Sequence, residues 1–196
     1  LLRFLRARKW HVADALAMLA ESLKWRRSLH VRQLMQQGEA ALNPFILTLG
    51  KNYVWKEDRD GMLPIYIRLA KHHKADQTLE ETNLFNIYSL ELYRIMRRHE
   101  EQLATIVFDL KDTGFGNADL GALQLIISMC QNYYPEQLGK ALVKDAPWIF
   151  PGIWKLVRPL LDPVVAAKVH FCSTKDMTKY FDPAHLPVEY GGEDPF

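Results

Sequence analysis

The chain has 196 residues, of which 48% are hydrophobic and 24% charged, a composition typical of a folded globular protein rather than a disordered one. Its 25 basic and 23 acidic residues give a formal net charge of +2, without the basic excess that marks nucleic-acid-binding domains. Cys130 and Cys172 are too few for a disulfide framework, which favours a reducing, cytoplasmic compartment. No apolar run approaches the roughly 20 residues of a membrane span.

Residues 1–42 are expected to form a small helical unit, because apolar residues recur at helical spacing from Val12 to Leu29 and Pro44 disfavours continuation. The opening LLRFLRARKW is typical of the middle of a helix rather than of a signal peptide, so we expect further chain upstream. Basic residues are concentrated in this unit. Contact with anionic lipid head groups and a solvated helix surface both explain them.

Beyond residue 43, short strand patterns alternate with helical patterns. The strand candidates are 52–55, 65–69, 103–110, 141–144 and 168–172, and the helix candidates are 78–98 and 119–134. Thr78 and Glu81 have capping-box spacing at the start of the longer helix. The continuous apolar run at 103–110 suits a strand covered on both faces. This order predicts an α/β fold with a mainly parallel sheet over residues 43–196.

Common catalytic signatures are absent, since there is no GxSxG elbow, no phosphate-binding loop and no HExxH helix. The cluster TGFGN at 113–117 lacks the third glycine of a nucleotide loop, which favours a turn. His72 and His73 are adjacent, and adjacent side chains rarely converge on one metal. Asp109 and Asp112 are better explained as caps of the turn after a strand. The sequence therefore predicts no enzyme, no metal site and no cofactor.

Several stretches together resemble the CRAL-TRIO family of lipid-binding proteins. LLRFLRARKWHVADALAMLAESLKWR is similar to the family's helical leader, and IVFDLKDTG to its central strand and turn. The block from CQNYYPEQLGKALVKDAPW to PLLDPVVAAKVHFCS resembles the family's most recognisable segment, and HLPVEYGG its terminal signature. The PW and GGEDPF details resemble CRAL-TRIO domains of motile-sperm-domain-containing and fungal-type transfer proteins, where the domain belongs to a longer chain.

The resemblance implies a lobe whose sheet floors an apolar pocket, closed by a mobile helical gate. The gate would lie within 148–161, where we expect Pro151-Gly152 and Pro159 to act as hinges. Its residues would be Trp148, Phe150, Ile153, Trp154, Val157, Leu160 and Leu161. Large or apolar residues on or beside the predicted sheet are candidates for the pocket wall. These are Tyr66, Ile87, Ala104, Ile106, Phe108, Tyr133, Tyr134 and Phe171.

Inositol-lipid-binding relatives use an arginine, a glutamate and a lysine at the head group, and the matching positions here are Arg8, Glu136 and Lys168. Lys9 and Asp162 are expected neighbours. Cationic side chains complement a phosphate, and a carboxylate accepts hydrogen bonds from inositol hydroxyls. A structural salt-bridge cluster between leader and lobe is the rival explanation for these charges.

Three departures from the family pattern bear on the ligand. Val165 stands where relatives often have threonine, which weakens the assignment of an inositol lipid. Ala104 and Ile106 stand near positions where relatives that also take phosphatidylcholine carry hydroxyl groups. The turn EDRDGMLPIY is also one residue longer than usual.

The sequence favours non-enzymatic binding and membrane exchange of a phospholipid, with phosphatidylinositol as the leading ligand. The expected partners are that lipid and a membrane surface, contacted peripherally and transiently by a cytoplasmic domain, with no nucleic acid. A carrier or sensor of another hydrophobe, such as a sterol, tocopherol or retinoid, remains an alternative. So does a protein-interaction or membrane-tethering scaffold.

Overall fold

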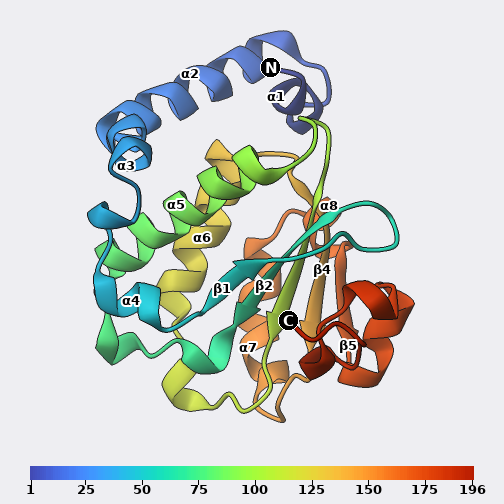
Figure 1. The fold of residues 1–196 in the computed structure, drawn as a ribbon. Coiled ribbons are helices and arrows are strands. Elements are labelled where there is room, and N and C mark those ends of the chain that lie inside the picture. Colours follow the sequence, from blue (N-terminus) through green and yellow to red (C-terminus); the bar gives the residue numbers. More distant parts are fainter.

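Five strands form one sheet in the order β1-β2-β3-β4-β5 in the computed structural model, which describes residues 1–196 (Figure 1). The strands are β1 (Asn52–Val54), β2 (Leu63–Arg68), β3 (Ala104–Asp109), β4 (Leu138–Lys144) and β5 (Val169–Cys172). β1 pairs antiparallel with β2, and every other neighbouring pair is parallel. The predicted α/β fold with a mainly parallel sheet is confirmed.

The amino-terminal residues form helices α1 (Leu2–Ala7), α2 (Val12–Ser28) and α3 (Val31–Gln37), followed by a 3₁₀ turn at Gly38–Ala41. We call residues 1–42 the leader. A short helix α4 (Pro44–Thr48) then begins at proline, and the side chain of Asn43 caps it by accepting a hydrogen bond from the backbone of Phe45. The leader lies across the top of the molecule in Figure 1.

Two long helices, α5 (Leu79–Met96) and α6 (Leu120–Tyr133), lie between the leader and the sheet (Figure 1). The predicted capping box is present, because Thr78 Oγ1 accepts from Glu81 N at 3.1 Å and Glu81 Oε2 accepts from Thr78 N at 2.8 Å. Asp119 caps α6 by accepting a hydrogen bond from Ala122 N at 2.9 Å. Short 3₁₀ turns at Leu69–Lys71, Lys74–Asp76 and Phe115–Asn117 lead into these helices.

The region between β4 and β5 contains α7 (Phe150–Val157), a 3₁₀ turn (Arg158–Leu160) and α8 (Pro163–Ala166). After β5 the chain folds back onto the sheet in three 3₁₀ turns, Thr174–Lys179, Pro183–His185 and Val188–Tyr190. The terminal glycine pair ends this segment for a steric reason. Gly191 has a φ of 86°, and a Cβ on Gly192 would overlap the carbonyl of Leu186.

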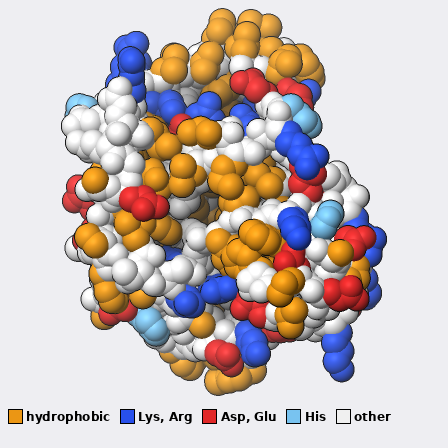
Figure 2. Space-filling model, viewed as in Figure 1, with side chains coloured by type: hydrophobic (Ala, Val, Ile, Leu, Met, Phe, Trp, Pro, Cys, Tyr) orange, Lys and Arg blue, Asp and Glu red, His pale blue; other side chains and the backbone are white.

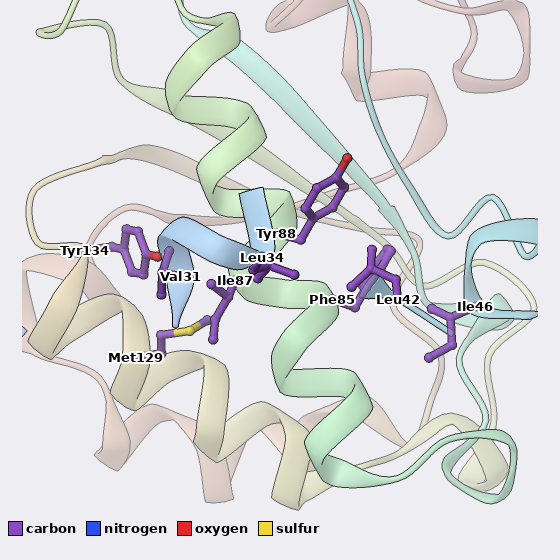
Figure 3. Close-up of a cluster of buried hydrophobic side chains, with 9 residues drawn as sticks. All are labelled: Val31, Leu34, Leu42, Ile46, Phe85, Ile87, Tyr88, Met129 and Tyr134. Atoms are coloured by element: carbon purple, nitrogen blue, oxygen red, sulfur yellow. The ribbon is translucent and has the colours of Figure 1, made fainter. Parts of the chain in front are cut away.

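One apolar core joins the leader to α5 and α6 (Figure 3). It consists of Val31, Leu34, Leu42, Ile46, Phe85, Ile87, Tyr88, Met129 and Tyr134. Trp25 of α2 adds an aromatic contact, since its ring stacks on that of Tyr133 with centroids 4.2 Å apart. The leader is therefore fixed to the helix layer rather than loosely tethered.

A second core lies between the sheet and the C-terminal turns. It consists of Tyr66, Val107, Leu142, Met177, Phe181, Leu186 and Tyr190, all of which are fully buried. The first three come from β2, β3 and β4, and the other four from the segment after β5. We call this the sealed face of the sheet, and the opposite side, which α5, α6 and α7 cover, the helix face.

Candidate ligand-binding site

The central strand β3 is buried unequally on its two sides. Thr105 and Val107, which point to the sealed face, are 0% exposed. Ile106 and Phe108 alternate with them and point to the helix face, yet both are only half-buried. A large apolar side chain in the middle of a sheet is normally packed closely by the layer above it. The helix face of the sheet is therefore incompletely filled by the protein itself.

The strand register extends this apolar surface across the sheet. Ile65 pairs with Ile106, which pairs with Ala141, which in turn pairs with Val169. The next row is Ile67, Phe108, Val143 and Phe171. Since side chains at paired positions share a face, these rows form a continuous apolar floor. At its β5 end, Phe171 is still 53% exposed.

Helix α7 covers the β5 end of this floor through aromatic contacts. The rings of Phe150 and Trp154 meet Phe171 edge to face, with centroids 5.8 and 5.4 Å apart. Although the sequence FPGIWKLV is strongly apolar, Val157 is the only buried residue of α7. Figure 2 shows hydrophobic side chains gathered around a hollow near the middle of the molecule. The arrangement is a lid of apolar residues over an apolar floor.

The structure brings half of the predicted wall residues to the helix face. The apolar rows of the helix face contain, or directly adjoin, Ala104, Ile106, Phe108 and Phe171. The other half lie elsewhere, and for them the prediction needs correction. Tyr66 is fully buried in the core of the sealed face, and Ile87, Tyr133 and Tyr134 pack in the core under the leader. Both faces of β2 are apolar, so the alternation of its residues could not indicate which face Tyr66 joins.

Most of the predicted gate residues occupy one short stretch of the structure. Phe150, Ile153, Trp154 and Val157 lie on α7, and Leu160 and Leu161 follow in and after the 3₁₀ turn. Trp148 precedes the helix and is 84% exposed. The expected hinges have ordinary geometric roles here: Pro151 lies in the first turn of α7, and Pro159 lies where the α-helix passes into 3₁₀ geometry.

Two of the predicted head-group residues lie close together at the amino ends of the strands. Lys168 Nζ donates a hydrogen bond to the carbonyl of Leu138 at 2.7 Å, two residues beyond Glu136. Glu136 has a left-handed backbone with a φ of 54°, and its carboxylate forms no ion pair. A non-glycine residue in this conformation is uncommon and often marks a functional position. Asp162 caps α8 by accepting from Val164 N at 2.8 Å.

The leader reaches the same edge of the sheet, but through arginines that the sequence did not single out. Arg3 donates hydrogen bonds to the carbonyls of Glu136, Glu100 and Gln102. Arg6 forms an ion pair with Glu101. Arg8 is half-buried and donates only to the carbonyl of Ala7. A polar junction between leader and lobe therefore exists, and it leaves Arg8 without a carboxylate partner.

A buried polar cluster at the opposite, carboxyl end of the strands was not predicted. His72 is 4% exposed, and its Nδ1 lies 2.7 Å from Lys51 Nζ and 2.6 Å from Gln77 Nε2. Its Nε2 lies 3.3 Å from Asp119 Oδ2. Burial and the neighbouring ammonium lower the pKa of His72, and burial lowers the pKa of Lys51 to about 8. His73 is exposed, so the adjacent pair does not converge.

The remaining candidate residues occupy structural positions. Asp109 Oδ1 accepts from Lys111 N at 3.2 Å, which fits the predicted capping of the turn, and also from Lys144 Nζ at 2.9 Å. In TGFGN, the side chain of Asn117 accepts from Gly114 N at 2.9 Å and closes the predicted turn. No group of three His, Cys, Asp or Glu side chains is arranged to hold a metal ion. None of the helices is both long and apolar enough to cross a membrane.

Comparison with known families matches the CRAL/TRIO domain over residues 47–192 and the CRAL/TRIO N-terminal domain over residues 1–21. A search of solved structures finds the crystal structure of Sfh5, with a TM-score of 0.81 and 19% sequence identity. The match covers 98% of this chain and 70% of that chain, which supports the fold. The chain belongs to the CRAL-TRIO family, as its sequence motifs indicated.

Curated relatives are similar over the full length of the chain. It is 37% identical to the phosphatidylinositol transfer protein CSR1 of Eremothecium gossypii, covering 100% of this chain and 47% of the relative. A CRAL-TRIO domain-containing protein of Schizosaccharomyces pombe is 35% identical, with 46% of its length covered. The SEC14 cytosolic factor of Eremothecium gossypii is 31% identical, and the match covers 98% of this chain and 68% of that protein. The chain thus spans about half the length of the first two relatives.

Proposed function

We propose that this domain binds one lipid-like molecule between the helix face of the sheet and α7, and exchanges it with membranes without catalysing a reaction. The observation that carries the proposal is the half-buried pair Ile106 and Phe108 in the middle of a central strand. Burying apolar surface stabilises by roughly 25 cal/mol per Å², so acyl chains would gain free energy by covering these side chains. The names of the relatives CSR1 and SEC14 cytosolic factor support this class of function.

Helix α7 is the element that would open. It contacts the floor through Phe150 and Trp154, and seven of its eight residues keep some exposure to solvent. An apolar helix held by few buried side chains can exchange contact with the floor for contact with a bilayer at little cost, because both environments are apolar. Opening at a membrane would then admit the acyl chains.

Phosphatidylinositol is the proposed ligand, with Arg8, Glu136 and Lys168 at its head group and Lys9 and Asp162 nearby. Two backbone contacts support this placement: Lys168 Nζ donates to the carbonyl of Leu138, two residues beyond Glu136, and Arg3 of the leader donates to the carbonyl of Glu136. Neither the guanidinium of Arg8 nor the carboxylate of Glu136 has an ion-pair partner within the chain. Charged groups without a partner are available for phosphate and hydroxyl groups of a ligand.

A sterol, tocopherol or retinoid is the second candidate, and a specific observation favours it. Val165 stands on α8 where inositol-lipid-binding relatives often have threonine, and Lys168 Nζ already donates to a backbone carbonyl. Thr105, the hydroxyl residue of the central strand, points to the sealed face and donates to Asp58. The helix-face side chains of β3 therefore offer no hydroxyl group to a polar head.

The test is transfer of labelled phosphatidylinositol between vesicles by the purified domain. Removing a charge-assisted hydrogen bond costs about 1.5–3 kcal/mol, so Arg8→Ala and Lys168→Ala should each lower phosphatidylinositol binding by at least about tenfold. The matched controls Arg27→Ala and Lys175→Ala remove exposed cations elsewhere and should transfer normally.

Unchanged phosphatidylinositol transfer in both Arg8→Ala and Lys168→Ala would overturn the head-group assignment. Extraction of a sterol or isoprenoid in place of phospholipid would favour the second candidate. A chain that neither binds nor transfers any of these molecules would contradict the proposed function and favour the scaffold alternative.

A further inference from the structure

A polar cavity of about 330 Å³ lies where α5 ends and the loop to β3 begins. Its lining includes three arginines and a histidine, which are Arg94, Arg97, Arg98 and His99. Ile95 is its one apolar residue, and neither the apolar floor of the sheet nor α7 contributes to it. The volume is in the range of small-molecule sites, and the lining suits a polar ligand rather than acyl chains.

The loop that forms this cavity is held in place from below by Gln102, which is 5% exposed. The side chain of Gln102 accepts a hydrogen bond from Arg98 N at 2.8 Å and donates to Glu57 Oε1 at 2.6 Å and to the carbonyl of Gly61 at 2.9 Å. The hydroxyl of Tyr93 donates to the backbone carbonyl of Gln102 at 3.4 Å. The wall of the cavity is therefore fixed by the protein itself.

Two arginines from distant parts of the chain meet at this loop. Arg97 Nη1 donates to the carbonyl of Glu100 at 3.0 Å, and Arg3 of α1 donates to the same carbonyl. Arg3 also donates to the carbonyls of Gln102 and Glu136. In Figure 1, α1 lies directly above the loop between α5 and β3. A carbonyl has no net charge, so it holds the two guanidinium groups together without neutralising them.

Most of the carboxylates near this pair are engaged by other arginines. The ion pairs are Glu91 with Arg26 and Arg94, Glu101 with Arg6, and Glu57 with Arg98. The carboxylates of Glu100 and Glu136 form no ion pair, and Arg3 contacts these two residues only through their backbone carbonyls. Burial and the charge of Arg97 lower the pKa of Arg3, and they outweigh the opposite effect of Glu101. The two guanidinium groups thus lie in uncompensated positive charge.

The dipole of α5 explains only part of this arrangement. Cations stabilise the carboxyl end of a helix, which accounts for Arg94 in the last turn and for Arg97, whose Nε donates to the carbonyl of Arg94 at 3.3 Å. It does not account for Arg3, which comes from another helix and adds a second guanidinium group. Arg97 also keeps N–H donors that have no acceptor within the chain.

We propose that this cavity binds a small molecule that carries a phosphate group, with Arg3 and Arg97 as the residues that hold the phosphate. A phosphate offers both negative charge and several acceptor oxygens, and guanidinium groups match both. The site goes beyond the proposed lipid function, because it shares no residue with the apolar floor. Since Arg3 belongs to the leader and Arg97 to the lobe, a bound phosphate joins the two units. Soluble phosphate compounds and phosphate-bearing lipid head groups offer the same chemistry.

The test is calorimetric titration of the chain with inorganic pyrophosphate, together with sedimentation on phosphatidylcholine vesicles that contain phosphatidic acid. Arg97→Ala should weaken binding by about tenfold or more, because a charge-assisted contact is lost. Arg3→Lys keeps the positive charge but not the planar fork and should also weaken binding, by a smaller factor. The matched control is Arg32→Ala, which removes an exposed cation from α3 and should bind as the unmodified chain does.

Pyrophosphate binding that is lost in Arg97→Ala supports the site with a soluble ligand. Binding to the vesicles alone, lost in the same variant, supports it with a lipid head group. Binding of neither probe, or equal binding by Arg97→Ala and Arg32→Ala, would overturn the proposal. Ile106→Trp, which adds bulk to the apolar floor, should keep full affinity for pyrophosphate, so a failure of the phosphate site is distinguished from a failure of the lipid pocket.

Discussion

The two faces of the central sheet are built from the same strands but are closed to different degrees. On the sealed face, seven side chains from the sheet and the C-terminal turns are fully buried. On the helix face, Ile106 and Phe108 stay half-buried, and Phe171 is half exposed beneath α7. The difference indicates that one face supplies stability while the other keeps apolar surface for a ligand.

The sealed face also satisfies its buried charges. Lys140 pairs with Asp58 at 3.1 Å, and Lys144 pairs with Asp109 at 2.9 Å. The hydrogen bond from Thr105 to Asp58 completes this arrangement under the C-terminal turns. Because every buried charge has a partner, this face can be dry and rigid. The rows of β3 and β4 side chains on the helix face contain no charged residue, so this part of the sheet can be reorganised at lower cost.

Truncating one apolar side chain on each face gives the largest expected difference between them. Leu142→Ala removes a fully buried side chain from the sealed face and should lower the free energy of unfolding by about 2–5 kcal/mol. Phe171→Ala, at a half-exposed position of the helix face, should cost less than about 1 kcal/mol in lipid-free protein. Chemical denaturation measures both values. Equal losses would show that the two faces are packed alike.

Enlarging side chains, rather than truncating them, tests the same difference at two neighbouring residues of β3. Val107→Trp overfills the sealed face and should cost about 1–3 kcal/mol or more. Ile106→Trp enters incompletely filled space, so we expect little loss of stability but a loss of lipid occupancy. Thermal unfolding and native mass spectrometry measure the two effects. A well-tolerated Val107→Trp, or an Ile106→Trp that unfolds the chain, would contradict the account.

The smallest expected effect concerns the polar cluster around His72, where the helix layer is tied to the sheet. The pKa of His72 in the folded chain lies below the value of about 6.5 that histidine has in an unfolded chain. As the pH falls below about 7, the unfolded chain therefore binds more protons than the folded chain does. The cluster therefore stabilises the fold above that pH, and its contribution is lost on acidification. The groups that face or adjoin the imidazole ring of His72 are Lys51, Gln77, Asp119 and His73.

Denaturation between pH 5 and 7.5 measures this effect. His72→Gln should cost about 1 kcal/mol at pH 7 and remove part of the pH dependence. The exposed neighbour provides the control, since His73→Gln should leave both unchanged. A steeper pH dependence in His72→Gln than in the unmodified chain would contradict the assigned direction of the pKa shift.

Local signals predicted the elements of the fold well. The apolar run at 103–110 and the capping box at Thr78 each act through neighbours close in sequence. The predictions that failed concerned the face of the sheet to which a side chain points and contacts between residues far apart in sequence. Tyr66 lies on a strand whose two faces are both apolar, and Tyr133 is drawn to the leader because its ring stacks on Trp25.

The polar contacts were the hardest to predict from the sequence. His72 meets Lys51 and Asp119 across sequence separations of 21 and 47 residues, and no local pattern marks such partners. Arg3 and Arg6 share one face of α1, but that spacing does not indicate that they, rather than Arg8, contact the lobe. Motif resemblance singled out Arg8 and Lys168, whose role at a head group stays a prediction, whereas the docking of the leader depends on long-range geometry.

Native mass spectrometry of the purified domain after incubation with mixed vesicles tests the central claim most directly. We expect a mass increase of one phospholipid per chain, identified by extraction as phosphatidylinositol and abolished by Ile106→Trp. A folded chain that remains empty after exposure to phosphatidylinositol, phosphatidylcholine and sterol vesicles would contradict it.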